Sequence, residues 1–308
     1  MRRIVDNKPL FIGLLFFLIL LIMIVLGPYL PFIDSELTKH GFLKTENKII
    51  PPPYDPSGQF LLGSDRSGRD LLSVLVLGSK ETFFTVLVIS VLCFIISVPF
   101  GLLAAFNRFG QMALHNWNIL FSRIPSLFFI LLMANNPLII FSNKRWIWLI
   151  VIIIVLEVGR LAEILRQQLN DLKTSEFILS GLAVGNKPLY MFRHYYLPYI
   201  FPQLSAVFVM LLGKIMFLIG QLGIFSIFIS QKFVMVGGII GGPPIYEMQN
   251  ASLAWPTLLG NILYDIQKNP WIPFSTALFI TFFIMTFNLL GQGIRNQIQK
   301  QYRVKHNL

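Results

Sequence analysis

Residues 82–106 contain no charged side chain. The hydrocarbon core of a bilayer is about 30 Å thick, and a helix of about 20 apolar residues crosses it. This stretch therefore predicts a membrane-spanning helix. The composition agrees, because 55% of the 308 residues are hydrophobic and only 13% are charged, whereas soluble domains carry about 25% charged residues. Too few polar residues remain to cover a soluble surface, which excludes a typical cytosolic enzyme and a disordered chain, and the single cysteine excludes a disulfide scaffold.

Similar apolar stretches recur along the chain. They predict an all-α integral membrane protein with six transmembrane helices at about residues 10–26, 82–106, 117–141, 146–164, 204–230 and 270–294. No small-residue cleavage pattern follows the first stretch, so we expect a retained signal anchor rather than a signal peptide.

The Lys and Arg residues give the expected orientation. They are dense at both ends of the chain, which predicts a multi-pass protein of the plasma or inner membrane with both termini in the cytoplasm. The net charge of +11 then reflects basic loops against anionic lipid rather than binding to nucleic acid.

This orientation divides the chain into four parts. Residues 1–30 form an N-terminal transmembrane helix, 31–80 an extracytoplasmic segment, 81–294 a five-helix core and 295–308 a cytoplasmic tail. Within the core, residues 166–203 form a cytoplasmic loop, and residues 231–269 form a Gly- and Pro-rich extracytoplasmic insertion.

The cytoplasmic loop predicts two short helices. Thr174 or Ser175 can cap the first one, with Glu176 in its first turn, and Gly185 can end it. Pro188 can begin the second helix, and the prolines at 198 and 202 are expected to stop it. Such an apolar pair either lies on lipid or fits the groove of a partner protein.

The same loop resembles the cytoplasmic "EAA" loop of ABC-importer permeases. Its Gly and the Pro of its Leu-Pro pair are thirteen residues apart, like Gly185 and Pro198 here. The chain departs from the family pattern at residues 179–181, where Leu-Ser-Gly replaces Glu-Ala-Ala. The resemblance implies that this loop couples to an ATPase, through Glu176, Phe177, Ala183, Gly185, Pro188, Leu197 and Pro198.

A second match lies before the second predicted span. Residues 62–73 read LGSDRSGRDLLS and resemble a signature of the second ("C"-type) permease of dipeptide, oligopeptide and nickel importers; its members here are Gly63, Asp65, Gly68, Arg69 and Asp70. The glycines permit tight turns, and Asp65 or Ser64 can cap a helix. Arg69 and Asp70 are adjacent and cannot face each other on a helix, so each is expected to pair elsewhere.

Further matches extend the resemblance. Residues 124–127 and 287–295 resemble family motifs in the third and last spans. The resemblance covers residues 1–30 loosely and 60–300 well, except for 224–254. There the chain is longer than the family, and this insertion either alters how a binding protein docks or is inert.

The resemblance implies a permease subunit rather than an enzyme. It would form a heterodimer with a homologous second permease, two ATP-binding subunits would bind it, and an extracytoplasmic solute-binding protein would deliver di- or oligopeptides. ATP and Mg would be bound by partner subunits and no cofactor by this chain, which has no phosphate-binding loop and no metal-ligand spacing among its histidines. Alternative functions are the import of nickel, metal chelates or haem, ion-coupled secondary transport without ATPases, and a non-transporting membrane scaffold or intramembrane enzyme.

Charged residues inside predicted spans are costly and often functional. Glu157 with Arg160, and Glu163 with Arg166, have i,i+3 spacing and are expected to pair on one helix. Lys214 lies about ten residues into the fifth span. It either lines the translocation path, pairs with a partner subunit or forms a structural pair.

Overall fold

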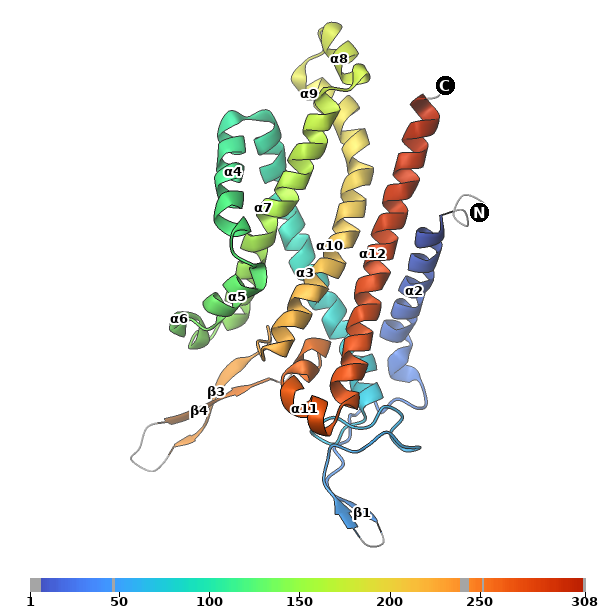
Figure 1. Cartoon of the computed structure of the whole chain (residues 1–308), viewed down its shortest axis with the longest axis vertical. Helices are drawn as coiled ribbons and strands as arrows, with labels where there is room; N and C mark the ends of the chain where they lie inside the picture. The colour runs from blue at the N-terminus through green and yellow to red at the C-terminus, as the bar shows by residue number, and fades with distance from the viewer. Residues whose placement is uncertain (1–6, 46–47, 239–243, 251, 307–308) are drawn as a thin grey trace.

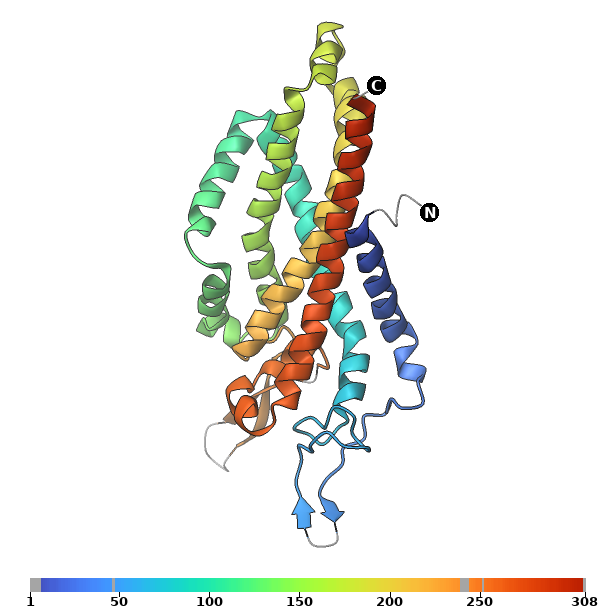
Figure 2. The same ribbon diagram turned by 45° about the vertical axis from the view of Figure 1, so that its right-hand side comes forward.

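The computed structural model describes residues 7–45, 48–238, 244–250 and 252–306. It is an elongated bundle of helices (Figures 1 and 2). The helices are α2 (Lys8–Val25), α3 (Leu71–Phe106), α4 (Arg108–Ser122), α5 (Ser126–Ala134), α6 (Pro137–Ile140), α7 (Arg145–Lys173), α8 (Glu176–Ala183), α9 (Pro188–Met191), α10 (Leu197–Ile224), α11 (Ile262–Lys268) and α12 (Trp271–His306). Short 3₁₀ turns lie at Gly27–Tyr29 and Trp255–Leu259.

Two short β-hairpins accompany the helices of this all-α fold. Strand β1 (Leu43–Thr45) pairs antiparallel with β2 (Lys48–Ile50), and β3 (Lys232–Gly238) pairs antiparallel with β4 (Pro244–Gln249). The second hairpin arises because Phe, Val and Tyr residues, which favour strands, flank the Gly- and Pro-rich segment. Both hairpins lie at one end of the bundle, which we call the hairpin end, and α8 and α9 lie at the other, the knob end (Figure 1).

Four helices are long and apolar enough to cross a membrane: α2, α3, the helix Pro188–Ile224 and the helix Trp271–Lys300. The predicted third span is not a single straight helix. It is replaced by α4 and α5, which meet at a bend of 77° and could form one broken span. Pro125 lies at this bend; proline disfavours helical geometry at the preceding residue and has no N–H to donate.

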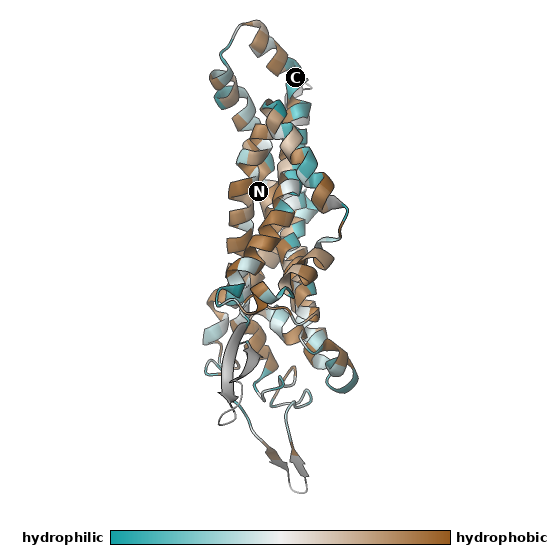
Figure 3. Cartoon of the chain, turned by 90° about the vertical axis from the view of Figure 1, so that its left-hand side faces the viewer, coloured by the Kyte–Doolittle hydropathy of each residue, from teal (hydrophilic) through white to brown (hydrophobic). Residues whose placement is uncertain are grey.

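Helix α7 contains the predicted fourth span but is not among the four apolar helices. Its apolar stretch carries Glu157, Arg160 and Glu163, and each charged residue lowers the apparent tendency of a helix to insert. Apolar residues otherwise run along most of the bundle (Figure 3).

The core is built where long helices pack side by side. The most extensive helix–helix contacts are those of α10 with α12, of α3 with α7, and of α2 with α12. Glycines bring α2 and α12 into backbone contact: a Cβ on Gly13 would lie 2.7 Å from Leu290 N, and one on Gly293 would lie 2.4 Å from Leu10 Cα. Close approach through small residues is how helices pack without a hydrophobic driving force.

Candidate functional site

The knob end carries α8, α9 and residues 184–187 between them, a unit that we call the α8–α9 knob (Figure 1). Helix α8 begins after Ser175, one of the two predicted caps. The Ser175 hydroxyl does not cap the helix, because it donates to Leu172 O at 2.6 Å instead. Glu176 lies in the first turn, as predicted, and is exposed.

Helix α8 ends as the sequence predicts. Gly185 has φ +80°, its N–H donates to Leu182 O at 2.9 Å, and the N–H of Asn186 reaches Gly181 O at 3.4 Å. These two bonds form a Schellman motif, which requires a left-handed residue at Gly185. Pro188 begins α9, also as predicted.

One face of the knob is buried against the bundle. Ile178 of α8 and Met191 of α9 are buried together with Leu172, Tyr196 and Ile200 of the neighbouring helices. A Cβ on Gly181 would lie 3.0 Å from Met191 Cε. The departure from Glu-Ala-Ala at residues 179–181 therefore places a glycine where α8 approaches Met191 closely.

The opposite face of the knob is apolar and exposed. Val184 is 80% exposed and Leu189 is 78% exposed, and Leu179, Leu182 and Tyr190 are also exposed. Of the predicted coupling residues, Phe177 is half-buried and its ring lies 6.0 Å from that of Tyr199. The others are exposed, namely Glu176, Ala183, Gly185, Pro188, Leu197 and Pro198. Exposed apolar side chains gathered in this way mark surfaces that bind proteins or membranes.

The expected stop at the two prolines is wrong. Residues Phe192–Tyr196 form a π turn that joins α9 to α10, and Pro188–Ile224 is one continuous helix. Pro198 falls in the first turn after the π segment, and Pro202 lies inside α10. The wider π turn shifts the hydrogen-bond register at the point where proline cannot donate.

At the hairpin end, the predicted signature forms a compact turn before α3. Asp65 accepts bonds from the N–H groups of Ser67 and Arg69, both at 2.9 Å, and its carboxylate lies 2.6 Å from the Arg69 guanidinium. Gly63 and Gly68 both have φ +77°. A Cβ on Gly68 would lie 2.1 Å from His40 O, so this position requires glycine.

The helix cap at this turn differs from the expectation. Asp70, rather than Asp65 or Ser64, is the N-cap of α3, and its carboxylate accepts from Ser73 N at 2.8 Å. Arg69 and Asp70 therefore pair with different partners, as predicted from their adjacency. The cap lies twelve residues before the predicted start of the span at residue 82, because α3 continues beyond the uncharged stretch.

An ion pair joins the signature to the last part of the chain, and sequence reasoning did not find it. Arg66 pairs with Asp265 of α11, which is fully buried, and also donates to Leu258 O at 3.0 Å. The two residues are 199 positions apart. No local spacing signals a pair at such separation.

A second charge cluster lies inside the bundle. Glu157 of α7 is fully buried, and its carboxylate lies 2.5 Å from Lys214 Nζ of α10 and 3.3 Å from Arg160 Nη1. Arg160 also donates to Ser126 Oγ of α5 at 3.0 Å. The expected pairs Glu157–Arg160 and Glu163–Arg166 are both present, the latter at 2.6 Å. Lys214 therefore has an ion-pair partner within its own chain.

A cavity of about 730 Å³ opens beside this cluster, between α7, α10 and α12. We call it the polar cavity. It is lined by Arg160, Leu161, Ile164, Gln168, Asp171, Tyr199, Gln203, Ala206, Val207, Met210, Leu211, Lys214, Arg295, Ile298 and Gln299. Ligand pockets commonly measure about 300–1,000 Å³, so the polar cavity can hold a small solute.

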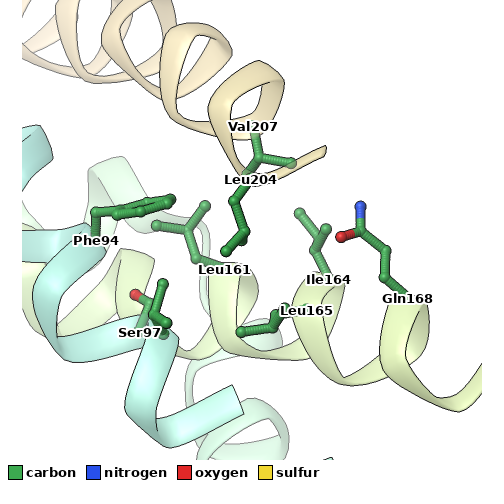
Figure 4. A pocket seen from close by; sticks show the side chains of 9 residues that line it. Phe94, Ser97, Leu161, Ile164, Leu165, Gln168, Leu204 and Val207 are labelled. Carbon is green, nitrogen blue, oxygen red and sulfur yellow. The ribbon is translucent and has the colours of Figure 1, made fainter. Parts of the chain in front are cut away.

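A smaller pocket lies where α7 meets α3 and α10 (Figure 4). Leu204 of α10 points toward Leu161 and Ile164 of α7, and Phe94 and Ser97 of α3 are also among the lining residues. Its volume is about 10 Å³, which is the space of a single water. Solute therefore fits the polar cavity and not this smaller pocket.

At the knob end, Lys173 ties α7 to α3. Its Nζ donates to Ala105 O and, at 3.1 Å, to Asn170 Oδ1. Burial lowers the pKa of Lys173. Among the described residues, no group of three His, Cys, Asp or Glu side chains could hold a metal ion.

The chain is similar to permease proteins over almost its whole length. It is 21% identical to the oligopeptide transport system permease protein OppC of Bacillus subtilis (98% of this chain, 89% of the relative). It is 23% identical to the dipeptide transport system permease protein DppC of the same organism (98% and 85%), and 24% identical to the di/tripeptide transport system permease protein DppC of Pseudomonas aeruginosa (97% and 90%).

Residues 97–304 match the family described as binding-protein-dependent transport system inner membrane component. This match spans α7, the α8–α9 knob, the polar cavity and nearly all of α12. The chain belongs to that family and is a multi-pass membrane protein.

Proposed function

We propose that this chain is one permease subunit of an ATP-driven importer of dipeptides and oligopeptides in the cell membrane. The family match and the names of the relatives support this function. The chain itself binds no cofactor in this proposal. ATP and Mg are bound by separate ATPase subunits, and the chain is not an enzyme.

The membrane topology is proposed to have six spans with both termini in the cytoplasm. Helices α2, α3, α10 and α12 supply four spans, and the bent pair α4–α5 supplies a fifth. Helix α7 supplies the sixth. Its charges are compensated by the pairs Glu157–Arg160 and Glu163–Arg166 and by Lys214, which lowers the cost of burying them in the membrane.

This topology places the knob end in the cytoplasm and the hairpin end outside. A homologous second permease completes the translocation path, two ATPase subunits bind on the cytoplasmic side, and a solute-binding protein docks at the hairpin end. The signature residues Gly63, Asp65, Gly68, Arg69 and Asp70 then shape the extracytoplasmic turn that supports this dock.

The observation that carries the proposal is the two-faced α8–α9 knob. Its inner face is packed into a core with α7 and α10, and its outer face presents exposed apolar side chains such as Val184 and Leu189. An amphipathic helix of this kind suits the hydrophobic groove of a partner. Because the knob is packed on α7 and continuous with α10, closure of the ATPases would move it with these helices as one body and give alternating access.

Reconstitution of the complete complex in liposomes tests the proposal. The wild-type complex is expected to transport labelled dipeptide or oligopeptide only when ATP is present on the side of the membrane where the ATPase subunits are bound. Gly185→Val is expected to reduce uptake at least tenfold while leaving ATP hydrolysis active, because a β-branched residue strongly disfavours the left-handed conformation. Gly185→Asn is the matched control, since Asn tolerates that conformation, and it should retain uptake.

Other outcomes point to other functions. ATP-dependent uptake of nickel or haem without peptide uptake would replace the substrate class. Peptide uptake that follows an ion gradient, in a preparation without ATPase subunits, would replace the mechanism with secondary transport. Normal coupling in the Gly185→Val variant would show that the knob is not the coupling element.

A further inference from the structure

The polar cavity is deep and charged at its inner end. Arg160 and Lys214 line this end, whereas Asp171 and Arg295 line the part nearer the knob end. Arg160 and Asp171 lie on the same helix, and a rise of 1.5 Å per residue separates them by about 16 Å along its axis. A solute that enters from the knob end therefore meets Lys214 and Arg160 at the far end of the cavity.

The charges that line the cavity are mainly positive. Three cations, Arg160, Lys214 and Arg295, face one carboxylate, that of Asp171. Glu157 lies behind the wall, fully buried, and is shared by Lys214 and Arg160. One buried carboxylate cannot neutralise two cations, so the inner end keeps an excess positive charge.

The two cations are held in place without being covered. The side chain of Arg160 is 44% exposed and that of Lys214 is 40% exposed, whereas Glu157 is fully buried. Lys214 Nζ lies 2.5 Å from Glu157 Oε2, yet this oxygen has no aligned hydrogen-bond donor among the described residues. An ammonium group has three N–H donors, so Lys214 has donors available for a further acceptor.

We propose that Lys214 and Arg160 bind a carboxylate group of the solute as it passes through the polar cavity. The inference rests on the proposed function, since peptides carry a terminal carboxylate. Glu157 is the positioning residue: it holds both cations at the wall. A guanidinium and an ammonium are suitable donors for a carboxylate, because charge-assisted hydrogen bonds are about twice as strong as neutral ones. The same positive charge repels a free divalent cation, which favours peptide over bare nickel.

The first experiment measures the charge of the cavity without relying on transport. Met210, which lines the cavity four residues before Lys214, is replaced by Cys in a Cys93→Ala background, in the whole complex in nanodiscs. Its reaction rate is compared for an anionic (sulfonatoethyl) and a cationic (trimethylammonioethyl) methanethiosulfonate reagent. The anionic reagent is expected to react faster.

Two further variants give opposite expectations. Lys214→Gln should lower the anionic-to-cationic rate ratio about a hundredfold, because removing a unit charge about 7 Å away at an effective dielectric constant of about 30 slows the anionic reagent and speeds the cationic one by about tenfold each. Glu157→Gln should raise the ratio, because it removes the compensating carboxylate. Lys214→Arg keeps the charge and should leave the ratio unchanged. An unaltered cavity that reacts no faster with the anionic reagent than with the cationic one would overturn the inference, and so would a cysteine unreactive to both reagents, because the cavity would then be filled in the complex.

The second experiment tests carboxylate recognition directly. Trialanine and trialanine amide are compared for their ability to protect the Met210→Cys thiol from a neutral methanethiosulfonate reagent, with no binding protein present. The free acid is expected to protect at several-fold lower concentration than the amide, and Lys214→Gln should abolish this difference while Lys214→Arg keeps it. Equal protection by acid and amide in the unaltered cavity would refute the proposal. If the charge ratio and the acid preference hold but no peptide is imported with ATP, the proposed function fails and the carboxylate site stands.

Discussion

The two ends of the bundle are rigid for different reasons. At the hairpin end, directional polar contacts fix the turn before α3: Asp65 with Arg69, Asp70 with Ser73, and Arg66 with buried Asp265. At the knob end, α8 and α9 are held by an apolar core that includes Ile178 and Met191, and their outer face is exposed and apolar. The polar contacts therefore hold the hairpin end in one conformation. The knob end is held by its packed inner face, and its outer face is free to contact a partner.

The largest test of this comparison is the ion pair at the hairpin end. Arg66→Ala leaves the fully buried Asp265 carboxylate without its cation, and loss of one partner of a buried pair costs about 3–5 kcal/mol. We expect a clear fall in the thermal unfolding temperature of the detergent-purified chain. The double variant Arg66→Ala with Asp265→Asn should recover part of it. An unchanged unfolding temperature in Arg66→Ala would mean that the hairpin end does not depend on this pair.

Two glycines in the same backbone conformation sharpen the comparison. Gly68 has φ +77° and Gly185 has φ +80°, but an added Cβ would lie 2.1 Å from His40 O at Gly68 and meets nothing within 4 Å at Gly185. Gly185→Ala should lower the free energy of unfolding by about 1–2 kcal/mol, because alanine must adopt the left-handed conformation but meets no neighbouring atom. Gly68→Ala should lower the free energy of unfolding by clearly more, because the backbone at His40 must also move to make room for the added Cβ. Equal unfolding temperatures of the two variants would contradict the view that the backbone is closely packed around Gly68 and open around Gly185.

The smallest effect on stability is expected at the outer face of the knob. Val184→Asp changes an 80% exposed side chain, and exposed substitutions usually alter stability by less than about 0.5 kcal/mol. The same variant should weaken retention of the ATPase subunits during purification, because it places a charge in an apolar contact. Val184→Ile is the conservative control. Retention of the ATPases by Val184→Asp at the wild-type level would argue against the outer face as their contact.

Local features of the knob end and of the long helices could be predicted from the sequence. The end of α8 at Gly185 and the start of α9 at Pro188 follow from backbone preferences of single residues. The Glu163–Arg166 pair follows from helical spacing. The apolar stretches identified α2, α3, α10 and α12 as helices long and apolar enough to cross a membrane, because length and hydropathy are local properties.

Features that depend on distant segments could not be predicted. The Arg66–Asp265 and Lys214–Glu157 pairs join residues that only tertiary packing brings together. The bend at Pro125 and the π turn before Pro198 show that a proline can either break a helix or be absorbed by it, and the surrounding packing decides which. The β3–β4 hairpin was not predicted, because the Gly- and Pro-rich sequence between its strands is typical of a loop.

The unbroken helix Pro188–Ile224 has a mechanical consequence. At 1.5 Å per residue, its Pro188 end lies about 54 Å from Ile224, while Lys214 lies about 15 Å from it. If this rod pivots near Ile224 by about 10°, its Pro188 end sweeps roughly 9 Å and Lys214 roughly 2.6 Å, by the same geometry. A large stroke at one tip thus becomes a small displacement of the ammonium group.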